Sequence, residues 1–294
     1  MIGAFLDQWL SGWRVRAALA VGVVILILAP VVLGANSYVT QILLTLFIFA
    51  VFGHAWNLLA GYCGLLSFGN QVYVGIAGFT MGILVYYGSV HVWVALPIAG
   101  LVSAAFAYLL AIPVRASRSG LSVLKPVAIA MVLWGGYEIL VFYDPWWDVF
   151  GDPYVRRVMI LLVIFLGAMP LLTLEGAYFA VATWLIAAAI GTVFNEWKLV
   201  GAGGGMRVPS SVTLEEMYYV GLLLLLITTW VIRLLLNSRI GLALTAVRDD
   251  AEAAATVGVD VARVKLVAFV LSGTLTGLAA GLYFIEAVSI TPPS

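Results

Sequence analysis

The chain has 294 residues, of which 64% are apolar and only 10% are charged, and its mean hydropathy is +1.13. A soluble domain carries about 25% charged residues, so this composition excludes an ordinary soluble domain and indicates that lipid is the solvent. The formal net charge is zero, which gives no overall attraction to nucleic acid, and the single cysteine, Cys63, excludes a disulfide framework or a cysteine-cluster metal site.

Repeated apolar stretches predict an all-α, polytopic membrane helical bundle of about nine spans in a single transmembrane domain, 1–294. A bilayer crossing needs about 20 apolar residues, and continuous apolar runs indicate helices because β-barrel strands are short and alternate in polarity. In chain order the predicted spans are 17–33, 40–59, 71–87, 92–112, 124–142, 158–172, 178–194, 218–236 and 266–288.

Residues 1–16 are predicted to form an interfacial lead-in to the first span. The apolar run 17–33 is longer than the core of a signal peptide, so we predict a retained membrane span. With the N-terminus in the cytoplasm, ten Lys and Arg residues fall inside and only four fall outside, as the positive-inside rule requires. The four outside are Arg156, Arg157, Lys198 and Arg207. This topology leaves Ser294 outside and predicts a multi-pass protein of the cell (inner) membrane.

The block 57–87 is rich in glycine, which predicts a broken helix rather than a plain lipid-facing one. Broken backbone at membrane depth is tolerated only where it is buried in protein or lines a cavity. Neutral polar groups in the block are therefore candidates for the translocation path: Asn57, Ser67, Asn70 and Gln71. The alternative is that the glycines only permit close packing while the polar groups bond neighbouring backbones.

The longest polar stretch, 237–265, is predicted to be a cytoplasmic loop that carries a short helix. Asp249 or Asp250 can cap this helix, and Glu252 stands three residues after Asp249 in a capping-box-like arrangement. An alanine run and the stop residue Gly258 complete a helix of about nine residues, 249–257. With Val247 and Val257 as apolar contacts, this helix suits docking into a groove of a cytoplasmic partner; alternatively, it is a solvated helix that ties two spans together.

In the last predicted span, Gly273, Gly277 and Gly281 recur at every fourth position. Small residues at this spacing form a smooth ridge that another helix can approach closely. We therefore predict helix packing along this ridge, either within the chain or against a partner permease.

Two blocks of the sequence resemble permeases of the branched-chain amino acid (Leu/Ile/Val) type ABC importer family, including its urea- and amide-type relatives. The block 57–87 contains a G-x-x-G-x-x-S-x-G run, and in 238–294 Glu252-Ala253-Ala254 followed by Gly258 resembles the EAA-type coupling loop. The resemblance implies contact of this loop with a separate ATPase, through Asp249, Asp250, Glu252, Ala253, Ala254 and Gly258.

The resemblance implies a permease subunit, not an enzyme, that passes branched-chain amino acids or similar small solutes into the cytoplasm. It carries no cofactor, since ATP and Mg²⁺ belong to the partner ATPase, and the sequence contains no G-x-x-x-x-G-K-[ST] phosphate loop. The implied partners are cytoplasmic ABC ATPase subunits, a second identical or homologous permease chain, an extracytoplasmic solute-binding protein and the lipid bilayer.

The sequence departs from the family pattern in two places. Residues 116–173 are predicted to be an inserted two-span hairpin. The chain also stops at Ser294, where members of the family usually continue with a further apolar helix. This predicts either a shortened chain or a helix supplied by another subunit. The runner-up function is an ATP-independent secondary transporter or channel. Such proteins usually place ionisable residues at the bilayer midplane, and only Glu138 comes close to that position.

Overall fold

The computed structural model describes residues 13–34, 37–116, 176–196, 206–207, 212–287 and 289–290. Apart from two paired two-residue strands, every regular element in these ranges is a helix. The elements are α2 (Trp13–Leu33), α3 (Tyr38–Asn57), the π-helix η1 (Leu58–Tyr62), α4 (Asn70–Tyr86), α5 (Val92–Ala116), α8 (Gly176–Glu196), β1 (Met206–Arg207), α9 (Leu214–Leu236), α10 (Arg239–Asp249), α11 (Ala251–Thr256), α12 (Val261–Ala287) and β2 (Ser289–Ile290).

Four of the described helices are long and apolar enough to cross a membrane: Tyr38–Tyr62, Val92–Leu110, Leu214–Leu236 and Val261–Ala287. Shorter apolar helices cover Ala20–Leu33, Asn70–Tyr86 and Phe179–Ala188. The prediction of an all-helical, multi-pass bundle is confirmed. Two of the nine predicted spans, 124–142 and 158–172, lie outside the described residues, as do Glu138 and almost all of the predicted insertion 116–173.

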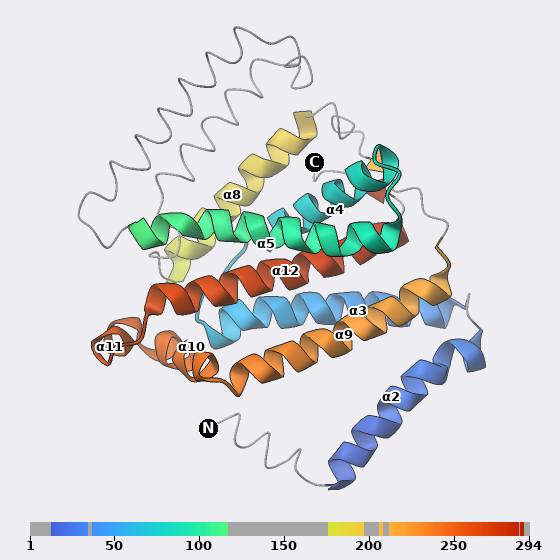
Figure 1. Ribbon diagram of the computed structural model, residues 1–294, viewed down its shortest axis with the longest axis horizontal. Coiled ribbons are helices and arrows are strands. Elements are labelled where there is room, and N and C mark those ends of the chain that lie inside the picture. The colour runs from blue at the N-terminus through green and yellow to red at the C-terminus, as the bar shows by residue number, and fades with distance from the viewer. Residues whose placement is uncertain are drawn as a thin grey trace, which may run out of the picture.

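Helix α12 lies at the centre of the bundle, with α5 and α4 on one side of it and α3 and α9 on the other (Figure 1). Its glycines allow α5 to approach closely. A Cβ atom on Gly273 would lie 2.9 Å from the Cβ of Ala107, and one on Gly277 would lie 2.5 Å from the Cβ of Ser103. One on Gly281 would lie 2.7 Å from Cδ1 of Leu96. The structure therefore places all three glycines in contacts within the chain, and we call this α12–α5 contact the glycine seam.

Helix α2 is fastened to α9 at the point where a proline interrupts its hydrogen bonding. Pro30 lacks an N–H, so the carbonyl of Leu26, four residues earlier, loses its usual helical partner. The hydroxyl of Tyr218 donates to that carbonyl at 2.7 Å, and Tyr219 donates to the next one, Ile27, at 3.2 Å. Tyr218 also packs against Phe47 of α3, with ring centroids 5.3 Å apart. Tyr218 thus replaces the hydrogen bond that the proline removes, and Tyr219 adds a second link to α2.

Helix α3 widens into η1 before it ends, and the chain is then non-helical until α4 begins at Asn70. The turn needs glycine at Gly64, whose φ of +73° lies in the left-handed region. Hydrogen bonds hold the turn in place, since Trp56 donates from Nε1 to the Ser67 carbonyl at 3.2 Å and Phe68 N–H donates to Oγ1 of Thr183 at 3.1 Å. Single-turn π-helices occur frequently at functional sites.

Candidate functional site

The polar segment 237–265 forms two short helices at one end of the bundle, α10 and α11 (Figure 1). The first was not predicted: residues 239–249 form a helix of their own, α10, which starts where the hydroxyl of Ser238 accepts the N–H groups of Ile240 and Gly241. The apolar spacing of Leu244 and Val247, both buried on one face, was the available signal.

The second helix is shorter than predicted, and it uses one of its two predicted caps. Asp250, not Asp249, caps α11, accepting the Ala253 N–H at 2.9 Å, so Glu252 falls one position short of the capping box. The helix has six residues rather than nine. It stops as predicted at Gly258, whose φ is +90°. The N–H groups of Gly258 and Val259 bond the carbonyls of Ala255 and Ala254, which is a Schellman ending.

One face of this helical pair is buried against the broken end of α3. Leu244, Val247 and Ala254 join a core cluster that includes residues of η1, of the turn after it and of α12: Leu58, Leu59, Cys63, Leu65, Val264 and Ala268. The expectation that Val247 is available for docking is therefore wrong, because only 4% of it is exposed, whereas Val257 is 79% exposed. Ala254, predicted to contact the ATPase, is buried as well.

Other residues of the pair are exposed. Five of the six residues predicted to contact an ATPase have exposed side chains or backbone: Asp249, Asp250, Glu252, Ala253 and Gly258. Val257, next to Gly258 in the chain, is an exposed apolar residue. We call this group of exposed residues the acidic face, because three of its members are carboxylates.

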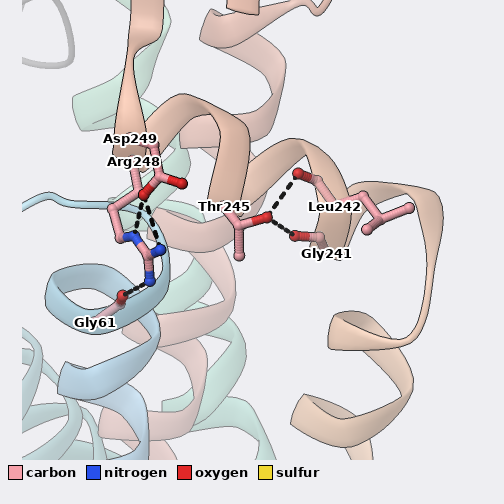
Figure 2. A network of polar contacts seen from close by, with 6 residues as sticks. All are labelled: Gly61, Gly241, Leu242, Thr245, Arg248 and Asp249. Carbon is pink, nitrogen blue, oxygen red and sulfur yellow. Dashed lines mark hydrogen bonds and ion pairs between the residues drawn. The ribbon is translucent and has the colours of Figure 1, made fainter. Parts of the chain in front are cut away.

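Arg248 forms a polar link between the acidic face and the broken helix, as Figure 2 shows. Arg248 donates from Nη1 to the carbonyl of Gly61 in η1 at 3.2 Å. Its Nε and Nη2 atoms both lie close to one carboxylate oxygen of Asp249, at 2.9 and 2.8 Å. Farther along α10, the hydroxyl of Thr245 donates to the carbonyl of Leu242 at 2.9 Å, within the same helix.

A cavity of about 400 Å³ opens between α10, α11 and the turn after η1. Its walls carry two cations and three carboxylates: Arg248, Lys265, Asp249, Asp250 and Glu252. Cys63 also lines it, in the turn outside the helical spans, and burial raises the pKa of its thiol to about 12, although the charge of Lys265 opposes the shift. Within the described ranges, no group of three His, Cys, Asp or Glu residues is arranged to hold a metal ion.

The four residues predicted for a translocation path lie at the break but differ in exposure. Ser67 is buried, and its hydroxyl accepts the Gly69 N–H at 3.2 Å, so it shapes the turn. Asn57 and Gln71 are exposed, and Asn70 is half-buried. The Oδ1 atom of Asn70 is buried without a hydrogen-bond partner. The side chain of Asn57 lies over Gly61, where a Cβ would approach its Cγ to 3.0 Å.

Three polar contacts in the structure were missed from the sequence. Arg248 was counted only as a cytoplasmic charge, and Ser272 donates to the carbonyl of Ala55 at 2.8 Å, just before α3 widens into η1. The third is Glu286, half-buried near the end of α12, which accepts a hydrogen bond from Thr45 of α3 at 3.1 Å. An ionisable residue inside a predicted span is a functional candidate in itself, so Glu286 could have been found.

Comparison with known proteins places these features in a family. Residues 132–294 match the family described as branched-chain amino acid transport system / permease component. The matched range includes 132–173, which belongs to the segment predicted to be an insertion.

Two relatives are similar over most of the chain. They are the high-affinity branched-chain amino acid transport system permease proteins LivM of Salmonella typhimurium and of Escherichia coli. Each is 27% identical over 247 residues, which cover 84% of this chain and 52% of the relative. The chain therefore spans about half the length of these relatives. No solved structure matches significantly.

Proposed function

The chain belongs to the family of branched-chain amino acid transport system permease components, and from this premise we propose that it is the membrane-embedded permease subunit of an ATP-driven importer. Its cargo would be branched-chain amino acids or similarly small solutes. The observation that carries the proposal is the acidic face: a pair of short helices packs apolar residues onto the end of the bundle and leaves carboxylates exposed. An exposed surface on helices that are attached to the bundle suits contact with a motor subunit.

The end of the bundle that holds α10 and α11 is proposed to lie in the cytoplasm. Five cationic residues belong to this end: Arg233, Arg239, Arg248, Arg263 and Lys265. At the opposite end, α9 starts with Glu215 and Glu216 in its first turn. An excess of Lys and Arg marks cytoplasmic loops. With nine spans and this orientation, the N-terminus is cytoplasmic as well.

The ATPase is proposed to contact Asp249, Glu252 and Ala253, with Val257 as an apolar neighbour. Asp250 and Gly258 support this contact indirectly, because they begin and end α11. Ala254 is a buried residue of α11 and supports this contact by holding the helix on the bundle. ATP and Mg²⁺ would bind to the ATPase, so this chain needs no cofactor of its own.

The path for the cargo is proposed to run past the break between α3 and α4. Asn57, Asn70 and Gln71 offer neutral donors and acceptors there, while Ser67 holds the turn that presents them. Neutral groups suit a path that must not bind its cargo tightly. A second permease chain would complete the path, and an extracytoplasmic binding protein would deliver the cargo.

Association with the ATPase tests the acidic face directly. We expect Glu252→Arg and Ala253→Asp to reduce co-purification of the ATPase subunit, because both change the charge of exposed positions without removing buried contacts. Glu215→Arg is the matched control, since Glu215 is exposed at the opposite end of α9. Full association of both acidic-face variants, with a normally folded chain, would contradict this surface assignment.

Uptake into proteoliposomes distinguishes the importer from a secondary transporter. The complete complex, reconstituted with its ATPase and binding protein, should accumulate radiolabelled leucine, isoleucine or valine only when ATP is supplied to the ATPase. Accumulation without ATP, driven by an ion gradient, would contradict the importer and favour a secondary transporter, and Glu286 would then be the first residue to test.

A further inference from the structure

We propose that Arg248 is a positioning residue that ties the acidic face to the broken end of α3, so that a movement of α10 and α11 is passed into η1. The proposal rests on the proposed function, because it concerns how an ATPase at the acidic face would act on the membrane helices. Three contacts of Arg248 support this role.

The first contact satisfies a helix end. The last carbonyls of a helix have no intrahelical partner, and the dipole gives that end a partial negative charge. The Gly61 carbonyl in η1 accepts the hydrogen bond from Nη1 of Arg248 at 3.2 Å. A cationic donor at a helix C-terminus is favourable, and this one belongs to a segment 187 residues away in the chain.

The second contact fixes the direction of the guanidinium group. Nε and Nη2 of Arg248 are both held by one oxygen of Asp249, which leaves Nη1 pointing at Gly61. The guanidinium is planar and rigid, so an arginine can hold both partners at once. A lysine carries the same charge on one flexible ammonium group and cannot reproduce this geometry.

The third contact is a close approach of two backbones. Gly64, in the turn after η1, would have its Cβ 3.3 Å from the Cα of Arg248 and 3.2 Å from its Cγ. The turn and α10 therefore touch with almost no intervening side chain. A shift of α10 toward the bundle must push this turn, and a shift away from it must pull on the Gly61 carbonyl.

The other side of η1 is held by a different helix. Ser272 of α12 is fully buried and donates to the Ala55 carbonyl at 2.8 Å, and α12 is locked to α5 through the glycine seam. The π-helix thus lies between a fixed attachment at Ala55 and a second attachment, at Gly61, that depends on α10. Next to the second attachment lies the 400 Å³ cavity, which gives α10 room to move. Asp249, with 68% of its side chain exposed, is within reach of a partner.

The test uses the complete transport complex with Arg248→Lys and Arg248→Gln, and Arg239→Gln as the matched control on the same helix. ATPase association and ATP hydrolysis should stay within about twofold of the unaltered complex, whereas uptake per ATP hydrolysed should fall by about fivefold or more, the usual range for loss of coupling between sites. Arg248→Lys should not restore coupling, because lysine keeps the charge but lacks the planar guanidinium group that holds Asp249 and Gly61 at once. Arg239→Gln should leave coupling unchanged.

Two results would overturn the proposal. One is unchanged uptake per ATP in both Arg248 variants. The other is a parallel loss of association, hydrolysis and uptake, which would make Arg248 merely structural. If the unaltered complex shows no ATP-dependent uptake at all, the proposed function fails instead, and the tie between α10 and η1 is then judged by labelling alone.

Labelling uses Cys63, the sole cysteine of the sequence, which is buried in the turn directly after η1. Loss of the Arg248 contact should expose Cys63 more often. A polar maleimide should therefore modify Cys63 about tenfold faster in Arg248→Gln. This factor corresponds to the loss of one charge-assisted hydrogen bond from the local opening equilibrium. Arg239→Gln should label at the original rate. Equal rates in the three proteins would show that Arg248 does not hold this turn.

Discussion

The glycine seam between α12 and α5 and the contact between α10 and η1 both bring two helices close together, but by different means. In the seam, backbone meets side chain directly because Gly273, Gly277 and Gly281 have no Cβ. At η1, buried residues such as Leu244 and Val247 share a core cluster with Leu58 of η1, and one arginine adds a polar tie with a cavity of about 400 Å³ beside it. The seam is closely packed, whereas the second contact combines a buried apolar part with an exposed polar tie and has open space beside it.

The difference indicates which part of the bundle can move. A close-packed interior has discrete arrangements and resists small displacements, so the seam should behave as a rigid unit. Solvent-exposed hydrogen bonds and low local packing are features of segments that open locally. The contact between α10 and η1 is therefore the better candidate for a joint, and the following substitutions test this contrast.

The largest effect is expected in the seam. Gly277→Leu should prevent stable folding or lower the stability by about 3 kcal/mol or more, because the added side chain would overlap Ser103 and the backbone of Ala99. Size-exclusion profiles and the thermal midpoint in detergent measure this. Gly75→Leu on α4 is the control, since nothing lies within 4 Å of a Cβ there. Similar behaviour of the two variants would contradict a close-packed seam.

A smaller effect is expected at the joint. Gly64→Ala should cost about 1–2 kcal/mol through left-handed strain and should also push Arg248 away, since the new Cβ would lie 3.3 Å from its Cα. Gly258→Ala has comparable strain at a φ of +90° but nothing within 4 Å. We expect both variants to lose stability and only Gly64→Ala to label faster at Cys63. Faster labelling in both would attribute the change to strain alone.

Much of the bundle could be predicted because the length of an apolar run can be read directly from the local sequence. Long apolar runs gave α3, α5, α9 and α12 to within about five residues, and the four-residue glycine spacing predicted close helix packing without indicating the partner. Gly258 was recognised as a stop because a Schellman ending is a local pattern.

The polar end was harder to predict because its structure depends on contacts between distant segments. Asp249 and Asp250 are equally good caps in sequence, and the choice of Asp250 follows from α10, which takes Asp249 as its last residue. The burial of Val247 and Ala254 depends on η1 lying beneath them. Arg248 could not be assigned to Gly61, since no local rule connects a residue to a carbonyl in another helix.

A third substitution tests the fixed attachment of η1. Ser272→Ala should lower stability by about 1 kcal/mol, because it leaves the buried Ala55 carbonyl without its donor, and such bonds inside membranes are typically worth less than 2 kcal/mol. Thr274→Val is the control, since the hydroxyl of Thr274 donates to the Val270 carbonyl within its own helix. Thermal midpoints should separate the two variants. Equal midpoints would mean that the Ser272 contact contributes little to holding α3.

The smallest effect is expected at the far end of α3, where Thr45 donates to Glu286. Thr45 also lies 3.0 Å from the Gln41 carbonyl, so its hydroxyl has a second acceptor within its own helix. Thr45→Val should therefore cost only about 0.5 kcal/mol and should leave Cys63 labelling unchanged, because α3 is held by Ser272 between the two positions. Labelling rates and thermal midpoints measure both effects. Faster labelling in Thr45→Val would mean that α3 moves as one rigid rod, and the joint would then involve the whole helix rather than η1.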